Sequence, residues 1–360
     1  MKVVHIETGR HLYGGALQVC YLMEGLAGHG VANLLVCSRG SAIAKTASGY
    51  ATVIELPIAG DLDLMFPFRL AMVLRRYHPD IVHVHSRRGA DLWSGISASL
   101  CRIPSVLTRR VDNQEWPPFA RLKYESYDRV VTISEGIRRV LLNEGVNPEK
   151  VSCIHSVVRT EDYQLQSDRA WFADQFGVQA DAPLVGVIAQ LIARKGHRYL
   201  LDITRQLVAH FPKLQIVFFG QGPLRADLEK QVNELGLAAV VHFAGFRKDM
   251  PQILPCLDLV VHPALMEGLG VSLLQAAAAG VPIVGTRSGG IPEIVHHQEN
   301  GLVVEPGNTE QLFEAVHTLL ANPGLARRCG AAGRNLVQRS FSLDTMIKQY
   351  IGLYNKLIDA

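Results

Sequence analysis

The chain has 360 residues and is 48% hydrophobic and 19% charged, a globular composition that excludes a disordered chain. No apolar stretch reaches the roughly eighteen residues of a membrane-spanning helix. Residues 1–160 hold 19 Lys and Arg against 14 Asp and Glu, whereas residues 161–360 hold 17 against 19. The basic first part indicates an anionic ligand, and chance surface charge is the alternative.

The first seven residues are expected to form a β-strand. We expect no export signal, because Glu7 falls where such a signal needs its apolar run. Six cysteines are scattered without a C-x-x-C pair, which is typical of buried, reduced thiols in the cytoplasm. Short β-branched runs then alternate with helical stretches. The expected strands of the first half are Lys2–Thr8, Val31–Cys37, Thr52–Glu55, Ile81–His85, Ser105–Thr108, Arg129–Ile133 and Val151–Ile154. This alternation predicts a parallel, doubly wound α/β domain over residues 1–160.

The alternation of strands and helices stops over residues 161–182, a polar segment that we expect to be a linker, and it resumes in residues 183–340. The expected strands there are Leu184–Ala189, Leu214–Phe219, Val240–Phe243, Leu259–His262, Pro282–Gly285 and Leu302–Val304. The amphipathic stretch Leu343–Ile358, within residues 341–360, is expected to be a helix that packs back on the first domain. Two such domains facing each other place their ligand sites at the carboxyl ends of the strands, around a cleft.

Three loops that follow strands carry candidate residues. Gly14-Gly15 opens a helix, where backbone amides favour a phosphate, although an ordinary tight turn explains it too. Arg194-Lys195, after the first strand of the second half, suits a diphosphate, and the alternative is a solvated basic loop. Glu267 precedes Gly268-Leu269-Gly270 at another helix start, a combination that packing alone does not explain.

Basic residues follow two strands of the first half: Arg87-Arg88 and Arg109-Arg110. We expect both pairs to project into the cleft and attract an anionic substrate. His85 lies near a strand tip and is a functional candidate, whereas His83 is expected to be a hydrogen-bonded histidine within the sheet.

Together these motifs resemble the signature of retaining GT-B glycosyltransferases, and most closely glycosyltransferase family 4. The resemblance covers nearly the whole chain. It rests on Glu267-Gly268-Leu269-Gly270, Gln275-Ala276, Gly280-Val281-Pro282, Gly289-Gly290-Ile291-Pro292-Glu293, Gly14-Gly15, Arg194-Lys195-Gly196 and Ala244-Gly245-Phe246. It implies a GT-B fold, a nucleoside-diphosphate-sugar donor on the second domain, an acceptor on the first, retention of anomeric configuration, and no metal or other cofactor.

The resemblance also implies roles for individual residues. Glu267 would contact the transferred sugar, with the amides of Gly268, Leu269 and Gly270 near that sugar and the phosphates. Lys195 would contact the diphosphate, Gly15 would lie near the phosphates, and Phe246 near the base.

Three positions depart from the family pattern. Gln275 replaces the second of two glutamates, which alters ribose recognition because an amide offers one acceptor oxygen. Gln190 replaces an arginine, and Arg194 is our candidate for the missing charge. A histidine usual after the fifth strand is replaced around Arg109-Arg110, so Arg110 and His85 are the first-domain catalytic candidates.

The expected reaction stabilises charge on a leaving diphosphate through Lys195, Arg194 and helix-start amides, while Glu267 holds the sugar. The expected acceptor is an anionic saccharide or lipid-linked saccharide of cell-envelope polysaccharide or lipopolysaccharide. Peripheral attachment to the inner face of the membrane would fit the basic first half, and no nucleic-acid partner is expected. The alternatives are a sugar-nucleotide epimerase of GT-B fold and a two-lobed solute-binding protein. A dehydrogenase is disfavoured, because the G-x-G-x-x-G motif is absent.

Overall fold

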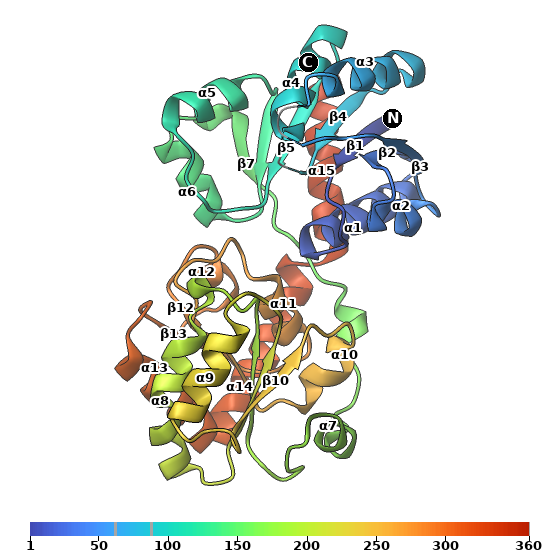
Figure 1. Cartoon of the computed structure of the whole chain (residues 1–360). Coiled ribbons are helices and arrows are strands. Elements are labelled where there is room, and N and C mark those ends of the chain that lie inside the picture. The colour runs from blue at the N-terminus through green and yellow to red at the C-terminus, as the bar shows by residue number, and fades with distance from the viewer. Residues whose placement is uncertain (61–62, 87–88, 360) are drawn as a thin grey trace. The chain divides into compact units, whose positions relative to one another are not determined.

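The computed structural model describes residues 1–60, 63–86 and 89–359. The described chain forms two compact units (Figure 1). Unit 1 comprises Met1–Val157 and the C-terminal segment from Leu343, and unit 2 comprises Val158–Ser342. None of the described helices is long and apolar enough to cross a bilayer.

Unit 1 is built on a seven-stranded parallel sheet with the strand order β3-β2-β1-β4-β5-β6-β7. Its strands are β1 (Lys2–Glu7), β2 (Ala32–Ser38), β3 (Thr52–Leu56), β4 (Ile81–Val84), β5 (Ser105–Arg109), β6 (Arg129–Thr132) and β7 (Val151–Cys153). Its helices are α1 (Gly14–Gly28), α2 (Ala42–Ala47), α3 (Phe66–Tyr77), α4 (Ala90–Cys101), α5 (Pro117–Glu125), α6 (Glu135–Asn143), the 3₁₀ turn η1 (Pro148–Lys150) and α15 (Leu343–Ile358).

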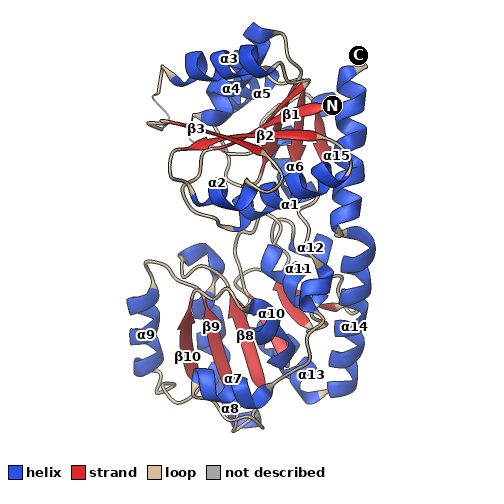
Figure 2. Cartoon of the chain, turned by 90° about the vertical axis from the view of Figure 1, so that its right-hand side faces the viewer, coloured by secondary structure: helices blue, strands red, loops and turns tan. Residues whose placement is uncertain are grey.

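Helices cover both faces of this sheet, because its strands carry apolar residues on both sides. Along β1, Val4 packs into one core with residues of α3, α4, α5 and α6. Its neighbour Val3 points to the opposite face and packs with α1 and α15. Figure 2 shows this layering of helices against the strands of each unit.

Helix α15 is fixed to the sheet by a buried polar network as well as by apolar packing. The two ring nitrogens of His83 on β4 lie 2.6 Å from the Tyr354 hydroxyl and 2.7 Å from the Thr108 hydroxyl. Thr108 is in turn 3.2 Å from the hydroxyl of Tyr350. Since a buried polar atom without a partner is costly, these bonds let a histidine occupy the core, as the sequence predicts for His83.

Unit 2 repeats the plan with a six-stranded parallel sheet in the order β10-β9-β8-β11-β12-β13. Its strands are β8 (Leu184–Ile188), β9 (Gln215–Phe219), β10 (Val241–Gly245), β11 (Leu259–His262), β12 (Ile283–Thr286) and β13 (Gly301–Val304). Its helices are α7 (Arg169–Phe176), α8 (His197–His210), α9 (Arg225–Glu234), α10 (Met250–Ile253), α11 (Val271–Ala278), α12 (Ile291–Ile294), α13 (Thr309–Ala321) and α14 (Pro323–Ser340), with 3₁₀ turns η2 (Thr160–Tyr163), η3 (Ala193–Lys195) and η4 (Leu254–Cys256).

Residues 161–182, expected to be a linker, fold as part of unit 2. The segment contains α7, whose first turn is capped by Asp168 accepting from Trp171 N at 2.9 Å. Phe172 of this helix is fully buried, and its ring lies edge-on to that of Phe219. The polar composition of the segment hid this short helix, because only one of its side chains is buried.

Both sheets reverse their strand order at one point, next to the first strand of each unit. In unit 1 this point lies between β1 and β4, and in unit 2 between β8 and β11. Ligands of doubly wound sheets bind at such reversals, outside the carboxyl ends of the strands. The predicted doubly wound α/β architecture is therefore confirmed, and it directs attention to the loops after these four strands.

Candidate active site

In unit 2, three functional side chains meet where β8 and β11 end. The Lys195 ammonium lies 2.6 Å from the Glu267 carboxylate, and the Nε2 atom of His262 lies 2.7 Å from the same oxygen. The other oxygen of Glu267 accepts from the Gly268 amide at 3.0 Å. Lys195 and His262 are buried, so this cluster is a rigid, preorganised set of charges.

Two glycines allow close backbone contacts with the loop after β11, one from the Lys195 loop and one from the loop after β12. Gly196 has a φ of +70° and Gly289 a φ of +53°. A Cβ atom would lie 1.9 Å from the Pro263 carbonyl oxygen at Gly196, and 1.6 Å from that of Glu267 at Gly289. The Leu265 amide also donates to the Arg194 carbonyl at 2.8 Å. The backbone thus fixes the distance between the Lys195 and Glu267 loops.

Glu267 is held as a carboxylate. Burial alone would raise its pKa, but the hydrogen bond and charge of His262, followed by the charge of Lys195, lower that pKa to about 2. Next to the cluster, burial and then the charges of His262 and Lys195 lower the pKa of His197 to about 4. The site therefore combines a fixed anion, a fixed cation and a neutral His197 at neutral pH.

The predicted donor-site residues that belong to unit 2 also lie at or near the carboxyl edge of its sheet. Gln190, after β8, and Phe246, after β10, are exposed, while Arg194 is half-buried. The residues that open α11 differ from one another: the Leu269 side chain is buried, whereas Gly270 has a φ of +98°. No side chain caps the N-terminus of α11, and Gln275 lies half-buried within this helix.

Unit 1 holds a cavity of about 420 Å³ at the carboxyl ends of β1, β4 and β5. It brings together four residues singled out in the sequence. They are Gly15, His85, Arg109 and Arg110. Gly14 is the first residue of the adjoining helix α1, so it lies beside this group. Arg87 and Arg88, the remaining acceptor candidates, lie outside the described residues.

Arg110 lines the cavity with few partners for its guanidinium. Its Nη1 atom has only a long contact of 3.5 Å to the Ser156 hydroxyl, and its Nε atom has no partner in the described part of the chain. Burial lowers the pKa of this guanidinium, opposed by the charges of Tyr350 and Glu7. A Cβ atom at Gly15 would lie 3.5 Å from the Arg110 Cδ atom, so the glycine borders the arginine.

Arg109 has a different role from the predicted acceptor binding. Its guanidinium donates to the Glu115 carboxylate at 2.7 Å and to the Tyr124 hydroxyl at 2.8 Å. It also donates to the carbonyls of Val111 and Asn113. Four of its five N–H donors are therefore engaged within unit 1, and the side chain holds the loop after β5.

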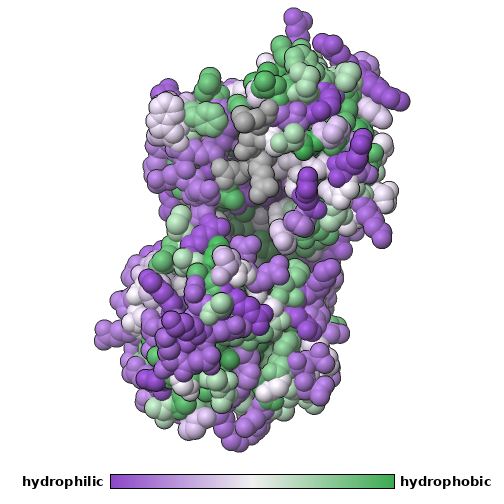
Figure 3. All heavy atoms as spheres, viewed as in Figure 1, coloured by the Kyte–Doolittle hydropathy of each residue, from purple (hydrophilic) through white to green (hydrophobic). Residues whose placement is uncertain are grey.

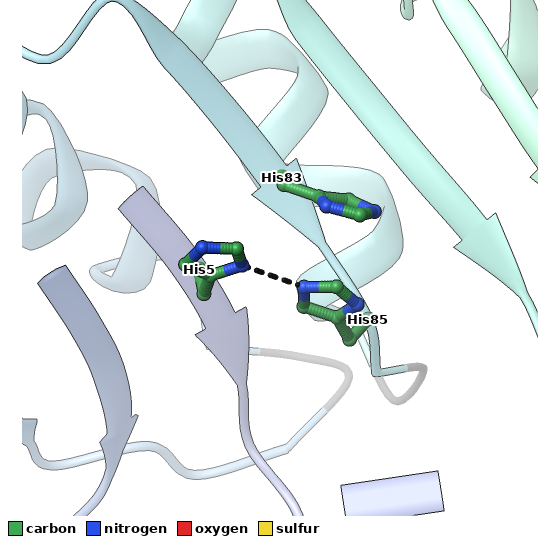
Figure 4. Close-up of side chains that lie close together, drawn as sticks. All are labelled: His5, His83 and His85. Atoms are coloured by element: carbon green, nitrogen blue, oxygen red, sulfur yellow. Dashed lines mark hydrogen bonds between the residues drawn. The ribbon is translucent and has the colours of Figure 1, made fainter. Parts of the chain in front are cut away.

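A chain of hydrogen bonds links His85 to the core of unit 1. The amide nitrogen of Asn33 donates to the Met23 and Tyr50 carbonyls, so its oxygen faces the Nε2 atom of His5 at 3.2 Å. His5 Nδ1 in turn lies 3.0 Å from His85 Nε2 (Figure 4). Burial, opposed by the Asn33 bond, lowers the pKa of His5 to about 4, so its ring is neutral.

The proton positions follow from this order. An amide oxygen only accepts, so His5 donates through Nε2 and accepts through Nδ1 from Nε2–H of His85. His85 is 4% exposed and burial lowers its pKa well below the ordinary value, so its Nδ1 carries a lone pair. That atom has no partner among the described residues, and His85 lines the cavity.

The ring nitrogens of His5, His83 and His85 lie within 4.8 Å of one another, close enough for a metal ion (Figure 4). Both nitrogens of His5 and both nitrogens of His83 already have hydrogen-bond partners, so metal binding would break these bonds. We therefore interpret the three histidines as a hydrogen-bonded core.

Sequence reasoning missed several neighbours of the two sites. His262 ends β11, five residues before Glu267, and this position after an apolar run could have singled it out. Glu7 ends β1, lines the cavity and is 6% exposed. Burial raises the pKa of Glu7, opposed by the Gly9 amide and Arg110. His5 is a polar residue inside an apolar strand, the same signal that marked His83.

Comparison with known proteins agrees with this division of the chain. Residues 13–162 match the family model "Glycosyltransferase Family 4", and residues 169–336 match "Glycosyl transferases group 1". The chain is 28% identical over 357 residues to the lipopolysaccharide core biosynthesis glycosyltransferase LpsE of Rhizobium meliloti, covering 98% of both chains.

Solved structures with low sequence identity share the fold. The Anabaena protein HepE, crystallised with UDP, has a TM-score of 0.88 at 20% identity, over 99% of this chain and 100% of its own. Sucrose-phosphate synthase of Thermosynechococcus elongatus has a TM-score of 0.83 at 20% identity, over 100% and 99%. The two family models together span most of the chain, which belongs to the GT-B glycosyltransferases of family 4.

Proposed function

We propose that this glycosyltransferase moves a sugar from a nucleoside diphosphate to a hydroxyl of an anionic glycan or lipid-linked saccharide, with retention of configuration and without a metal. The observation that carries the proposal is the cluster of Lys195, Glu267 and His262 beside the uncapped start of α11. A diphosphate carries the charge that a buried ammonium and the amides at a helix start stabilise.

The two ends of the donor fit different members of the site. Lys195, Arg194 and the amides of Leu269 and Gly270 would bind the diphosphate and stabilise the charge that grows on its leaving oxygen. Glu267 would accept from sugar hydroxyls and stabilise the electron-poor anomeric carbon, which requires the ionised form that His262 and Lys195 maintain. Phe246, 53% exposed, is available to contact the base, and Gln190 and Gln275 would complete the nucleotide contacts.

Unit 1 would bind the acceptor in the cavity that Gly15, His85 and Arg110 line. The Arg110 guanidinium suits a phosphate or carboxylate of the acceptor. The leaving phosphate would take the proton of the attacking hydroxyl, so this mechanism needs no further base.

Incubation of the enzyme with nucleoside diphosphates and their sugars tests the donor assignment. We expect the matching nucleotide to raise the unfolding temperature, because a ligand that binds only the folded state stabilises it. With an anionic oligosaccharide acceptor, proton NMR should show a product with the anomeric configuration of the donor, and added EDTA should leave the rate unchanged. Conversion of donor to a different sugar nucleotide without acceptor would instead establish the epimerase alternative.

Arg110→Ala tests the acceptor assignment. We expect the KM for an anionic acceptor to rise about tenfold or more, since a hydrogen bond to a charged group contributes about 1.5–3 kcal/mol. The KM for the donor should stay unchanged. Arg139→Ala removes an exposed arginine of α6 and serves as the control. An unchanged acceptor KM in Arg110→Ala, or an equal rise in both variants, would contradict the assignment.

A further inference from the structure

Large apolar side chains are exposed mainly on one part of unit 1. Of the sixteen such residues in the described chain, nine fall between positions 64 and 122. They belong to α3, α4 and α5 or immediately precede these helices. They are Leu64, Met65, Phe68, Met72, Ile96, Leu100, Trp116, Phe119 and Leu122, and we call them the α3–α5 surface.

Helix α3 carries two apolar faces, of which only one packs in the protein. Leu70 and Leu74 are fully buried in the core of unit 1. Met65, Phe68 and Met72 are 57%, 66% and 63% exposed, and their spacing of three and four residues places them in one stripe. The outer face of a surface helix is normally polar, so folding does not account for this second stripe.

Helices α4 and α5 extend the stripe. Ile96 and Leu100 are one turn apart on α4. Trp116 immediately precedes α5 and Leu122 lies within it, and their side chains are 71% and 72% exposed. The three helices pack into the same core over one face of the sheet, and the Ser97 hydroxyl of α4 donates to the Pro67 carbonyl of α3 at 3.2 Å. Figure 3 shows apolar side chains interspersed with hydrophilic ones over this part of unit 1.

The charges around these side chains are predominantly positive. Residues 64–122 hold nine Arg, no Lys and four acidic residues. Of these four acids, Asp91 and Glu115 form buried ion pairs with Lys123, and Asp80 accepts from the Lys2 amide. Four arginines of the same region are exposed, and none of them forms an ion pair with a described residue. They are Arg75, Arg76, Arg102 and Arg121.

We propose that the α3–α5 surface docks on a bilayer that contains anionic phospholipids. Aromatic and aliphatic side chains that alternate with arginines match the layered chemistry of a membrane interface, with acyl chains below and phosphates above. The tryptophan at the start of α5 has the amphipathic ring that favours this interface. A protein partner would be expected to pair such arginines with a fixed set of acids, whereas a lipid surface accepts them in any position. This inference goes beyond the proposed reaction, because it involves neither the donor nor the acceptor site.

Flotation with lipid vesicles tests the proposal on the full-length protein. We expect binding to vesicles of phosphatidylcholine with phosphatidylglycerol, and weak binding to phosphatidylcholine alone. Arg75→Gln with Arg76→Gln should weaken binding to the anionic vesicles roughly 30-fold, because each basic residue near an anionic surface contributes about fivefold. Phe68→Ser with Leu122→Ser should weaken it about tenfold or more through lost apolar burial.

The chain offers a matched control for each pair. Arg327→Gln with Arg328→Gln removes two adjacent exposed arginines of α14 in unit 2, and Leu165→Ser removes an exposed apolar residue of the same unit. Both controls should bind vesicles like the parent. Equal binding by all variants, or equal binding to both kinds of vesicle, would overturn the proposal. Self-association without lipid that the Phe68 and Leu122 substitutions abolish would also overturn the proposal, since a second copy of the chain would then cover the α3–α5 surface. Nucleotide-induced stabilisation should persist in every variant, which separates this test from that of the proposed function.

Discussion

Lys195→Ala is expected to lower turnover by about 10²–10³-fold, the loss typical when one preorganised donor to a developing charge is removed. The ammonium is buried and 2.6 Å from the Glu267 carboxylate, and alanine has no group that replaces this charge. Turnover measured at saturating donor and acceptor isolates this effect from binding. Because the charge of Lys195 helps to keep the pKa of Glu267 near 2, the acid limb of the pH–rate profile should also move to higher pH.

Lys213→Ala is the matched control, because Lys213 belongs to the same unit but is 63% exposed in an ion pair with Asp181. It should retain the parental rate, as exposed pairs contribute little. Circular dichroism and nucleotide-induced stabilisation verify that both variants are folded. Parental turnover in folded Lys195→Ala would exclude an electrostatic role for this residue in the reaction.

The fold could be predicted closely because its signal is local. Each of the thirteen strands in the described part of the chain has an expected counterpart within a residue or two, since a parallel strand covered on both faces reads as a short apolar run. The helix expected at Leu343–Ile358 has those bounds as α15. The helix α7 was missed because a single buried side chain leaves no periodic pattern.

The sites could be predicted only as far as chain position determines them. Lys195 and Glu267 follow strands of one sheet and Arg110 follows a strand of the other, so topology places each of them at the carboxyl edge of its own sheet. The contacts of Arg109 and His85 do not follow from topology, because their partners lie elsewhere in the sequence and have no fixed spacing. Arg109 and Arg110 are neighbours with the same chemistry, yet one is engaged by Glu115 and Tyr124 while the other borders the cavity.

Glu115→Gln is expected to lower the free energy of unfolding of unit 1 by about 3 kcal/mol at neutral pH, within the range for breaking a buried ion pair. The side chain of Glu115 is 9% exposed and lies between Arg109, at 2.7 Å, and Lys123, at 2.6 Å. Burial alone would raise the pKa of Glu115, but the hydrogen bonds and charges of Lys123 and Arg109 lower it to about 2. A neutral amide would leave the Arg109 guanidinium, itself 2% exposed, without its carboxylate.

The pH dependence of this loss gives the sharper test, because its direction is fixed by the depressed pKa of the folded state. The carboxylate contributes its full stabilisation above its ordinary pKa of 4.5 and loses it as pH falls through about 2. The difference in free energy of unfolding between parent and Glu115→Gln should therefore be constant at neutral pH and narrow as the solution becomes acidic.

Urea unfolding in a Trp171→Phe background reports on unit 1, since the remaining tryptophans, Trp93 and Trp116, belong to it. Glu125→Gln, at the last residue of α5 and 51% exposed beside Lys150, should change stability by less than about 1 kcal/mol at any pH. A gap for Glu115→Gln as small as that of this control would show that Asp91 and the remaining partners are sufficient for the two buried cations.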